Sequence, residues 1–203
     1  MKPRALELAD EEGRHPTWEM ALLYPDQGGW TEADYLRLDI GRHVDFSSGY
    51  LEFQPIPDEK HQAILFFLVQ ALKTFAGREG GKATMAPFPM RLWEEKYREP
   101  DALFMKREHL DRCGQKYWGP ADLVIEVVSE SNRDHDVSTK REEYAQAGIP
   151  EYWLVHPEAG TITVLGLKDN AYAVHGEFQR SRKAASQVLA GYEVDVSSAL
   201  DAG

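Results

Sequence analysis

The chain has 203 residues, of which 42% are hydrophobic and 11% aromatic, and its formal net charge at pH 7 is −11. This length and apolar content predict one globular domain with a substantial core and argue against a disordered chain. The acidic charge disfavours a nucleic-acid-binding protein, which usually has a basic face, although bound divalent cations could offset it. The single cysteine, Cys113, excludes an internal disulfide and a zinc site built from cysteines.

The sequence also argues against a membrane protein. Its longest apolar run, AILFFLVQAL at residues 63–72, is shorter than the roughly 18 residues that a membrane-spanning helix needs. The N-terminal residues are polar and acidic, unlike a secretory signal. We therefore expect a cytoplasmic protein without a membrane partner.

The sequence predicts an irregular extension over residues 1–30, followed by a single domain over residues 31–203. Thr31 begins a short helix, since Asp34 completes a capping box. The elements expected next are a hairpin over 43–55 and a helix over 60–76 that ends at Gly77. One stripe of that helix is apolar and comprises Ile64, Leu68, Ala71, Leu72 and Phe75.

The C-terminal half predicts mostly strands. The first, residues 82–93, contains prolines, which favour an edge or bent strand. Further strands are expected at 98–105, 121–128, 151–156, 161–167, 171–178 and 191–196. A helix over 136–147, stopped by Gly148, is expected between the strand at 121–128 and the hairpin at 151–167. The order of elements predicts an α/β or α+β sheet with helices packed on it.

Two of these apolar strands contain acids. Glu126 lies between Ile125 and Val127, and Asp101 opens the apolar run ALF. An isolated buried carboxylate costs several kcal/mol, so a cation, hydrogen-bond donors or a metal should compensate for it. A salt bridge or a solvated strand end would explain one such acid. Two carboxylates on separate strands instead favour a hard divalent cation such as Mg²⁺.

Lys140 is a candidate partner for this pair. It lies four residues after Asp136, which can cap or begin the helix, and on one stripe with Tyr144 and Ala147. If that stripe packs on the sheet, the amine reaches Glu126. The alternative, an exposed helix lysine in an ordinary ion pair, is what periodicity alone favours.

Several other residues are assigned no site role. Asp122, about 13 Å from Glu126 along the strand, is expected at a solvated strand end. Tyr144, Tyr152 and Trp153 are expected in the core. His43, like the histidines at 15, 109, 135 and 175, shows no metal-ligand spacing.

The string EPDALF, followed by ADLVIEVVSESN and YAQAGIPEYWLV, resembles the Uma-two family of endonucleases, part of the PD-(D/E)XK superfamily. The resemblance is strong over residues 99–167 and looser over 31–200. It implies a restriction-endonuclease-like α/β (α+β) fold, with a central mixed sheet flanked by helices. It also implies a metal-dependent endonuclease that uses Mg²⁺, or Mn²⁺ in its place.

The family's site residues are carried over by position. The resemblance implies metal ligands at Asp101, Glu126, the backbone carbonyl of Val127 and Glu52. It implies catalytic roles for the same three acids, for Lys140, which would orient or deprotonate a water, and for His61, near the site. The chain departs from the motif at Val128, where a lysine would stand, and at Glu130, where the family often has proline.

The function expected from the resemblance is hydrolysis of phosphodiester bonds in nucleic acid, with DNA favoured over RNA. Members of this fold commonly pair, so we expect a homodimer. Two alternatives stay open. The acidic charge and the missing lysine at position 128 fit a non-catalytic binding or assembly protein, and the charge also fits a hydrolase of a small phosphorylated molecule.

Overall fold

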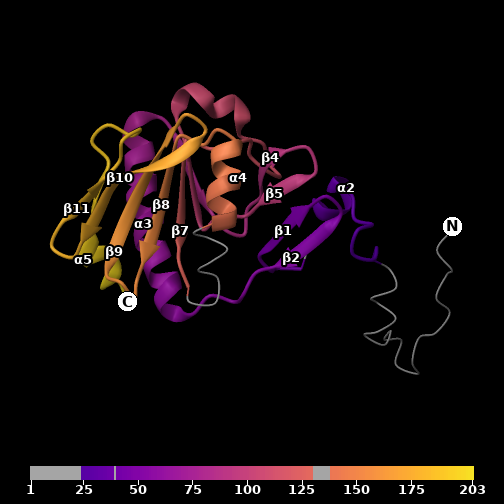
Figure 1. The fold of residues 1–203 in the computed structure, drawn as a ribbon, viewed down its shortest axis with the longest axis horizontal. Coiled ribbons are helices and arrows are strands. Elements are labelled where there is room, and N and C mark those ends of the chain that lie inside the picture. The colour runs from indigo at the N-terminus through magenta and orange to yellow at the C-terminus, as the bar shows by residue number, and fades with distance from the viewer. Residues whose placement is uncertain (1–23, 39, 130–137) are drawn as a thin grey trace.

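The computed structural model describes residues 24–38, 40–129 and 138–203, which form two main sheets and a short β-ribbon (Figure 1). The smaller sheet has the order β2-β1-β5-β4, with strands Tyr50–Phe53, Val44–Ser47, Lys96–Arg98 and Met90–Trp93. The larger sheet has the order β10-β9-β8-β7-β6-β3, with strands Ala171–Gln179, Thr161–Lys168, Glu151–His156, Leu123–Val127, Ala102–Met105 and Lys82–Met85. The ribbon pairs β11, Lys183–Ala185, with β12, Glu193–Asp195.

The larger sheet is mixed, as the family resemblance implies. Strands β7 and β8 are parallel, and its other neighbouring strands are antiparallel. A parallel pair needs a crossover connection, and α4, Lys140–Gln146, lies within it. The remaining helices are α2, Glu32–Tyr35; α3, Glu59–Glu79; the 3₁₀ helix η1, Arg107–Arg112; and α5, Val196–Leu200.

Helices cover both faces of the larger sheet. Leu123, Ile125 and Val127 of β7 pack in one apolar cluster with α3 and α5. Val124 and Val128, on the opposite face, pack with Tyr144 of α4. This alternation along β7 is the two-residue period of a strand, and it confirms a central mixed sheet flanked by helices. It also places Glu126 on the face that α4 covers.

The predicted helices are confirmed with shifted ends. Thr31 and Asp34 form the expected capping box, but the helix that they start is only four residues long. In α3 the predicted stripe is buried except for Ala71, which is partly buried, yet the helix passes Gly77 and ends at Gly80, whose φ of 81° is left-handed. A left-handed residue closes a helix, so Gly80 and not Gly77 is the stop.

Two predicted strands are each divided between the two sheets. Residues 82–93 form β3 at the edge of the larger sheet and β4 at the edge of the smaller one. Residues 98–105 were expected as one strand, but β5 ends at Arg98 and β6 begins at Ala102. Prolines at 87, 89 and 100 lie in the two interruptions, where the missing N–H prevents continued pairing. The chain therefore passes from one sheet to the other directly before Asp101.

Candidate active site

The two predicted acids lie side by side because β6 and β7 pair antiparallel, with Ala102 opposite Ile125. Asp101 directly precedes β6 and Glu126 follows Ile125, so both belong to the same end of the sheet. Asp101 is 7% exposed and Glu126 is 2% exposed. Both carboxylates are therefore removed from water and need compensating groups.

Asp101 is held by the backbone of β7 and by the start of α3. Val127 N donates to Asp101 Oδ2 at 2.7 Å, and His61 Nε2 lies 3.2 Å from Oδ1. The Asp58 carboxylate caps α3 by accepting from His61 N at 2.7 Å, which fixes the histidine at the first turn. Burial raises the pKa of Asp101, but the bond with His61 and the charge of Lys140 outweigh it, so this pKa lies below its ordinary value.

Glu126 is compensated by two groups from α4. Lys140 Nζ lies 3.0 Å from Glu126 Oε1, and Tyr144 Oη donates to the same oxygen at 2.8 Å. Lys140 and Tyr144 are four residues apart and share a helix face. Lys140 is 2% exposed, so the alternative of an exposed surface lysine is wrong. The Lys140 amine reaches the site from α4. Val128, which stands where the motif would have a lysine, packs in the apolar cluster beside α4.

Glu52 is not brought to this pair. It lies on β2 of the smaller sheet, and its carboxylate binds Arg98 Nη1 at 2.5 Å. Its side chain is 48% exposed, and it is not among the residues that line the cavity at Asp101 and Glu126. The structure therefore gives no support to Glu52 as a ligand of the same metal, because Arg98 holds its carboxylate in the smaller sheet.

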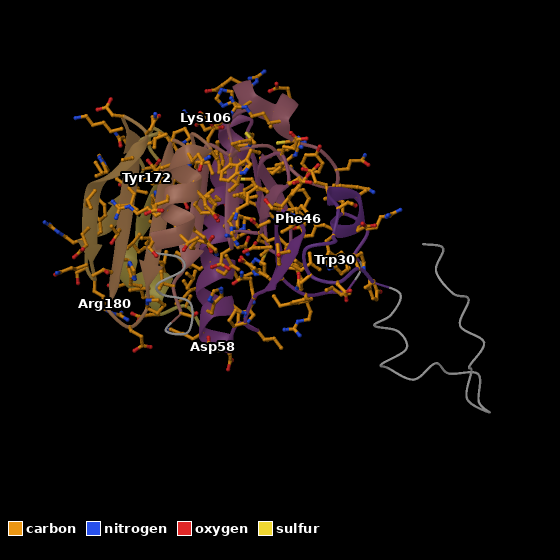
Figure 2. The ribbon with its side chains drawn as sticks, turned by 45° about the vertical axis from the view of Figure 1, so that its right-hand side comes forward. Trp30, Phe46, Asp58, Lys106, Tyr172 and Arg180 are labelled. Carbon is orange, nitrogen blue, oxygen red and sulfur yellow. The ribbon has the colours of Figure 1, made fainter. Side chains whose placement is uncertain are left out.

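A cavity of about 170 Å³ opens at the two acids. Asp101, Glu126, Val127, Lys140 and His61 line it together with His43, Ser129 and the segment 54–58. Figure 2 shows Asp58, which belongs to that segment, at the end of the molecule opposite Lys106. The cavity thus joins the end of the larger sheet to the start of α3, and it gathers every predicted site residue except Glu52.

His43 is a cavity residue that spacing in the sequence does not reveal. It precedes β1, and its Nε2 bonds to the backbone carbonyl of Glu99. Burial lowers the pKa of His43, and the charge of Lys140 adds to that effect, although Asp45 and Asp101 oppose it. The imidazole is therefore neutral at neutral pH. No sequence signal marks this residue, because the smaller sheet brings it to the cavity from far along the chain.

Asp122 was expected at a solvated strand end, and this prediction is wrong. It is 1% exposed. Its carboxylate accepts from Lys106 N at 2.7 Å and lies 2.7 Å from His109 Nδ1. The chain turns back after β6, which brings residues 106–109 over Asp122 and buries it. Asp136 and Glu130 lie outside the described residues, as do positions 1–23 of the expected extension.

The donor set at the acids fits a hard cation. Asp101 and Glu126 offer carboxylate oxygens at the same end of the adjoining strands β6 and β7. Val127, the residue after Glu126, offers its backbone carbonyl oxygen. Mg²⁺ is typically bound through one or two carboxylates while it keeps several waters. Among the residues that the structure describes, no three His, Cys, Asp or Glu side chains gather as a metal site. A cation here would therefore take its remaining ligands from water, and from substrate oxygens once a substrate is bound.

Comparison with known proteins relates most of the chain to one family and one solved fold. The family described as Uma2, "Putative restriction endonuclease", matches residues 32–197. A crystal structure described as a "putative nuclease belonging to DUF820", from Anabaena variabilis, is 15% identical and has the same fold, with a TM-score of 0.68. That match covers 84% of this chain and 97% of the other.

Comparison with curated proteins gives no match. Within the described residues, no helix is long and apolar enough to cross a membrane. The family match spans most of the chain, and the fold shared with the crystal structure agrees with it. The chain therefore belongs to the Uma2 family, whose description is "Putative restriction endonuclease".

Proposed function

We propose that the cavity at Asp101 and Glu126 hydrolyses phosphodiester bonds of DNA with the help of Mg²⁺. The observation that carries the proposal is the meeting of two buried carboxylates with a buried lysine, Lys140, in one cavity that is open to a substrate. Burial of three charged groups is costly for folding, and a cleft with such groups is a typical reaction site.

Each residue has a separate task in this proposal. Asp101, Glu126 and the Val127 carbonyl would hold the cation. Mg²⁺, when bound, would supply Lewis-acid polarisation of the scissile phosphate and a more acidic water. His61 keeps the Asp101 carboxylate oriented through its bond to Oδ1. Lys140, whose amine lies 3.0 Å from Glu126, stabilises negative charge on the phosphate and orients the attacking water.

Hydrolysis itself forms a P–O bond from the water oxygen and breaks the bond to the leaving sugar oxygen. The water loses a proton and the leaving oxygen gains one. The overall reaction needs no oxidant or reductant, so the residues in the cavity need only bind, orient and move protons. Tyr144 contributes by fixing the Glu126 oxygen that faces Lys140.

A substrate panel tests the proposal. Supercoiled plasmid, linear duplex, single-stranded DNA, RNA and a small phosphomonoester would each be incubated with Mg²⁺, with Mn²⁺ and with a chelator. Glu126→Gln and Asp101→Asn would be compared with Asp111→Asn, which changes an exposed acid on η1. We expect metal-dependent DNA cleavage by the wild type and by the control, and none by the two site variants.

The other outcomes separate the alternatives. Turnover of the phosphomonoester alone would identify a small-molecule hydrolase, and binding without cleavage would identify a non-catalytic nuclease fold.

The homodimer stays a prediction, which light scattering of the purified protein would check. The single domain over residues 31–203 stays a prediction as well.

A further inference from the structure

A buried arginine links the smaller sheet to the helix that carries Lys140. Arg98 is the last residue of β5, and its side chain is 2% exposed. Its Nε and Nη2 bind the two oxygens of Glu143 on α4, at 2.7 and 2.9 Å. Its third nitrogen, Nη1, binds Asp45 at 2.9 Å and Glu52 at 2.5 Å. We call this the Arg98 clamp.

The clamp acts on a helix with few means of fixing itself. Helix α4 has seven residues, Lys140–Gln146, and it is preceded by only two π-helical residues, 138 and 139, in the part of the chain that the structure describes. A helix of this length is not stable alone, so tertiary contacts must set its position. Glu143 is three residues after Lys140 and lies near it on the helix surface. Lys96 Nζ adds a second cation at 2.6 Å from Glu143.

The geometry points to Arg98 as a positioning residue for Lys140. We propose that the paired bonds between Arg98 and Glu143 fix α4 so that the Lys140 amine stays within reach of Glu126 and the scissile phosphate. Two parallel charge-assisted bonds define direction as well as distance. The smaller sheet thereby takes part in the reaction through the helix. This inference rests on the proposed function, since it assigns Lys140 a role there.

A milder substitution than Arg98→Ala is needed to test this, because removing the arginine would strand the buried Asp45 carboxylate. Glu143→Gln leaves Arg98 paired with Asp45 and Glu52. Glu142→Gln, at the neighbouring exposed position, is the matched control. Arg98→Lys keeps the charge but loses the paired geometry, and it is the second variant if Glu143→Gln unfolds. Thermal unfolding of each variant verifies the fold.

The first readout is independent of activity. The rate of reductive methylation of the Lys140 amine, followed by peptide mass spectrometry, reports whether that buried amine leaves its place. We expect faster methylation in Glu143→Gln than in the wild type and in Glu142→Gln, at a temperature well below unfolding. Equal rates in all three proteins would overturn the proposal, whether or not the wild type cleaves any substrate.

The second readout uses bis(4-nitrophenyl) phosphate with Mn²⁺, a diester too small to contact the rest of the surface. Misplacement of a reacting group by about 1 Å costs on the order of 100-fold in rate. We expect kcat of Glu143→Gln to fall about 10- to 100-fold, with KM and Mn²⁺ affinity unchanged. In a Lys140→Met background, Glu143→Gln should cause no further loss.

Equal losses of kcat in both backgrounds would show that Glu143 acts independently of Lys140 and would refute the positioning role. If the wild type cleaves neither DNA nor the small diester, the proposed function fails. The methylation rates then still decide whether the Arg98 clamp holds Lys140 in place.

Discussion

Lys140→Met tests the buried ion pair most sharply. Methionine has a similar length and no charge, so the substitution removes the ammonium group while it keeps most of the packing. Glu126, which is 2% exposed, then loses the cation that lies 3.0 Å from its Oε1. Tyr144 Oη still donates to the same oxygen, but a neutral donor compensates a buried charge only in part.

The size of the effect follows from the geometry. At 3.0 Å, an effective dielectric constant of about 20 gives an attraction of about 5 kcal/mol. Removing one partner of a buried pair typically costs about 3–5 kcal/mol, because the other charge is left without compensation. We therefore expect Lys140→Met to lower the free energy of unfolding at pH 7 by about 3–5 kcal/mol.

Urea denaturation followed by tryptophan fluorescence and circular dichroism would measure this loss. Lys73→Met, at an exposed position of α3, is the control and should stay within about 0.5 kcal/mol of the wild type. Glu126→Gln added to Lys140→Met should raise stability again, because it removes the stranded charge. A double variant no more stable than Lys140→Met, or a loss below about 1 kcal/mol for Lys140→Met alone, would refute the buried pair.

Three further predictions concern the groups around this pair. Tyr144→Phe should lower the free energy of unfolding by about 1–3 kcal/mol, because a buried hydrogen bond to Glu126 is lost; denaturation with no change in midpoint would contradict it. Asp122→Ala should cost about 1–3 kcal/mol since it leaves Lys106 N without its carboxylate acceptor, whereas a solvated strand end would tolerate it. Burial raises the pKa of Asp45, but the charge of Arg98 outweighs it and the pKa lies below its ordinary value. The stability that Asp45 contributes is therefore present above about pH 4 and is lost as the pH falls through the folded-state pKa. The difference in unfolding free energy between wild type and Asp45→Asn should shrink below pH 4, and a constant difference would contradict this.

The sequence predicts the fold where periodicity is strong and local. The apolar stripe of α3, the capping box at Thr31 and the hairpin formed by β8 and β9 are all read from neighbouring residues. The assignment of strands to sheets, in contrast, cannot be read from neighbouring residues. The break between β5 and β6 at Pro100 depends on the chain changing sheets, and no local pattern records which sheet a strand joins.

Local sequence patterns also reveal only part of the site. Asp101 and Glu126 stand out because a charge inside an apolar strand is unusual, and Lys140 follows from the family motif. His43 and Arg98 do not stand out, because their roles depend on the smaller sheet meeting α4 and the cavity. Glu52 was expected among the ligands from its position in the motif, but a long-range ion pair with Arg98 holds it elsewhere.

We propose that the Asp101 and Glu126 carboxylates are buried at this site in order to hold a cation. Calorimetric titration of the metal-free protein with Mg²⁺ and with Mn²⁺ would measure this binding in the wild type, in Glu126→Gln and in the exposed-site control Asp111→Asn. We predict binding to the wild type and to the control, and loss of that binding in Glu126→Gln. Equal binding by all three proteins, or binding by none, would contradict a cation-holding role and leave Glu126 as the structural partner of Lys140.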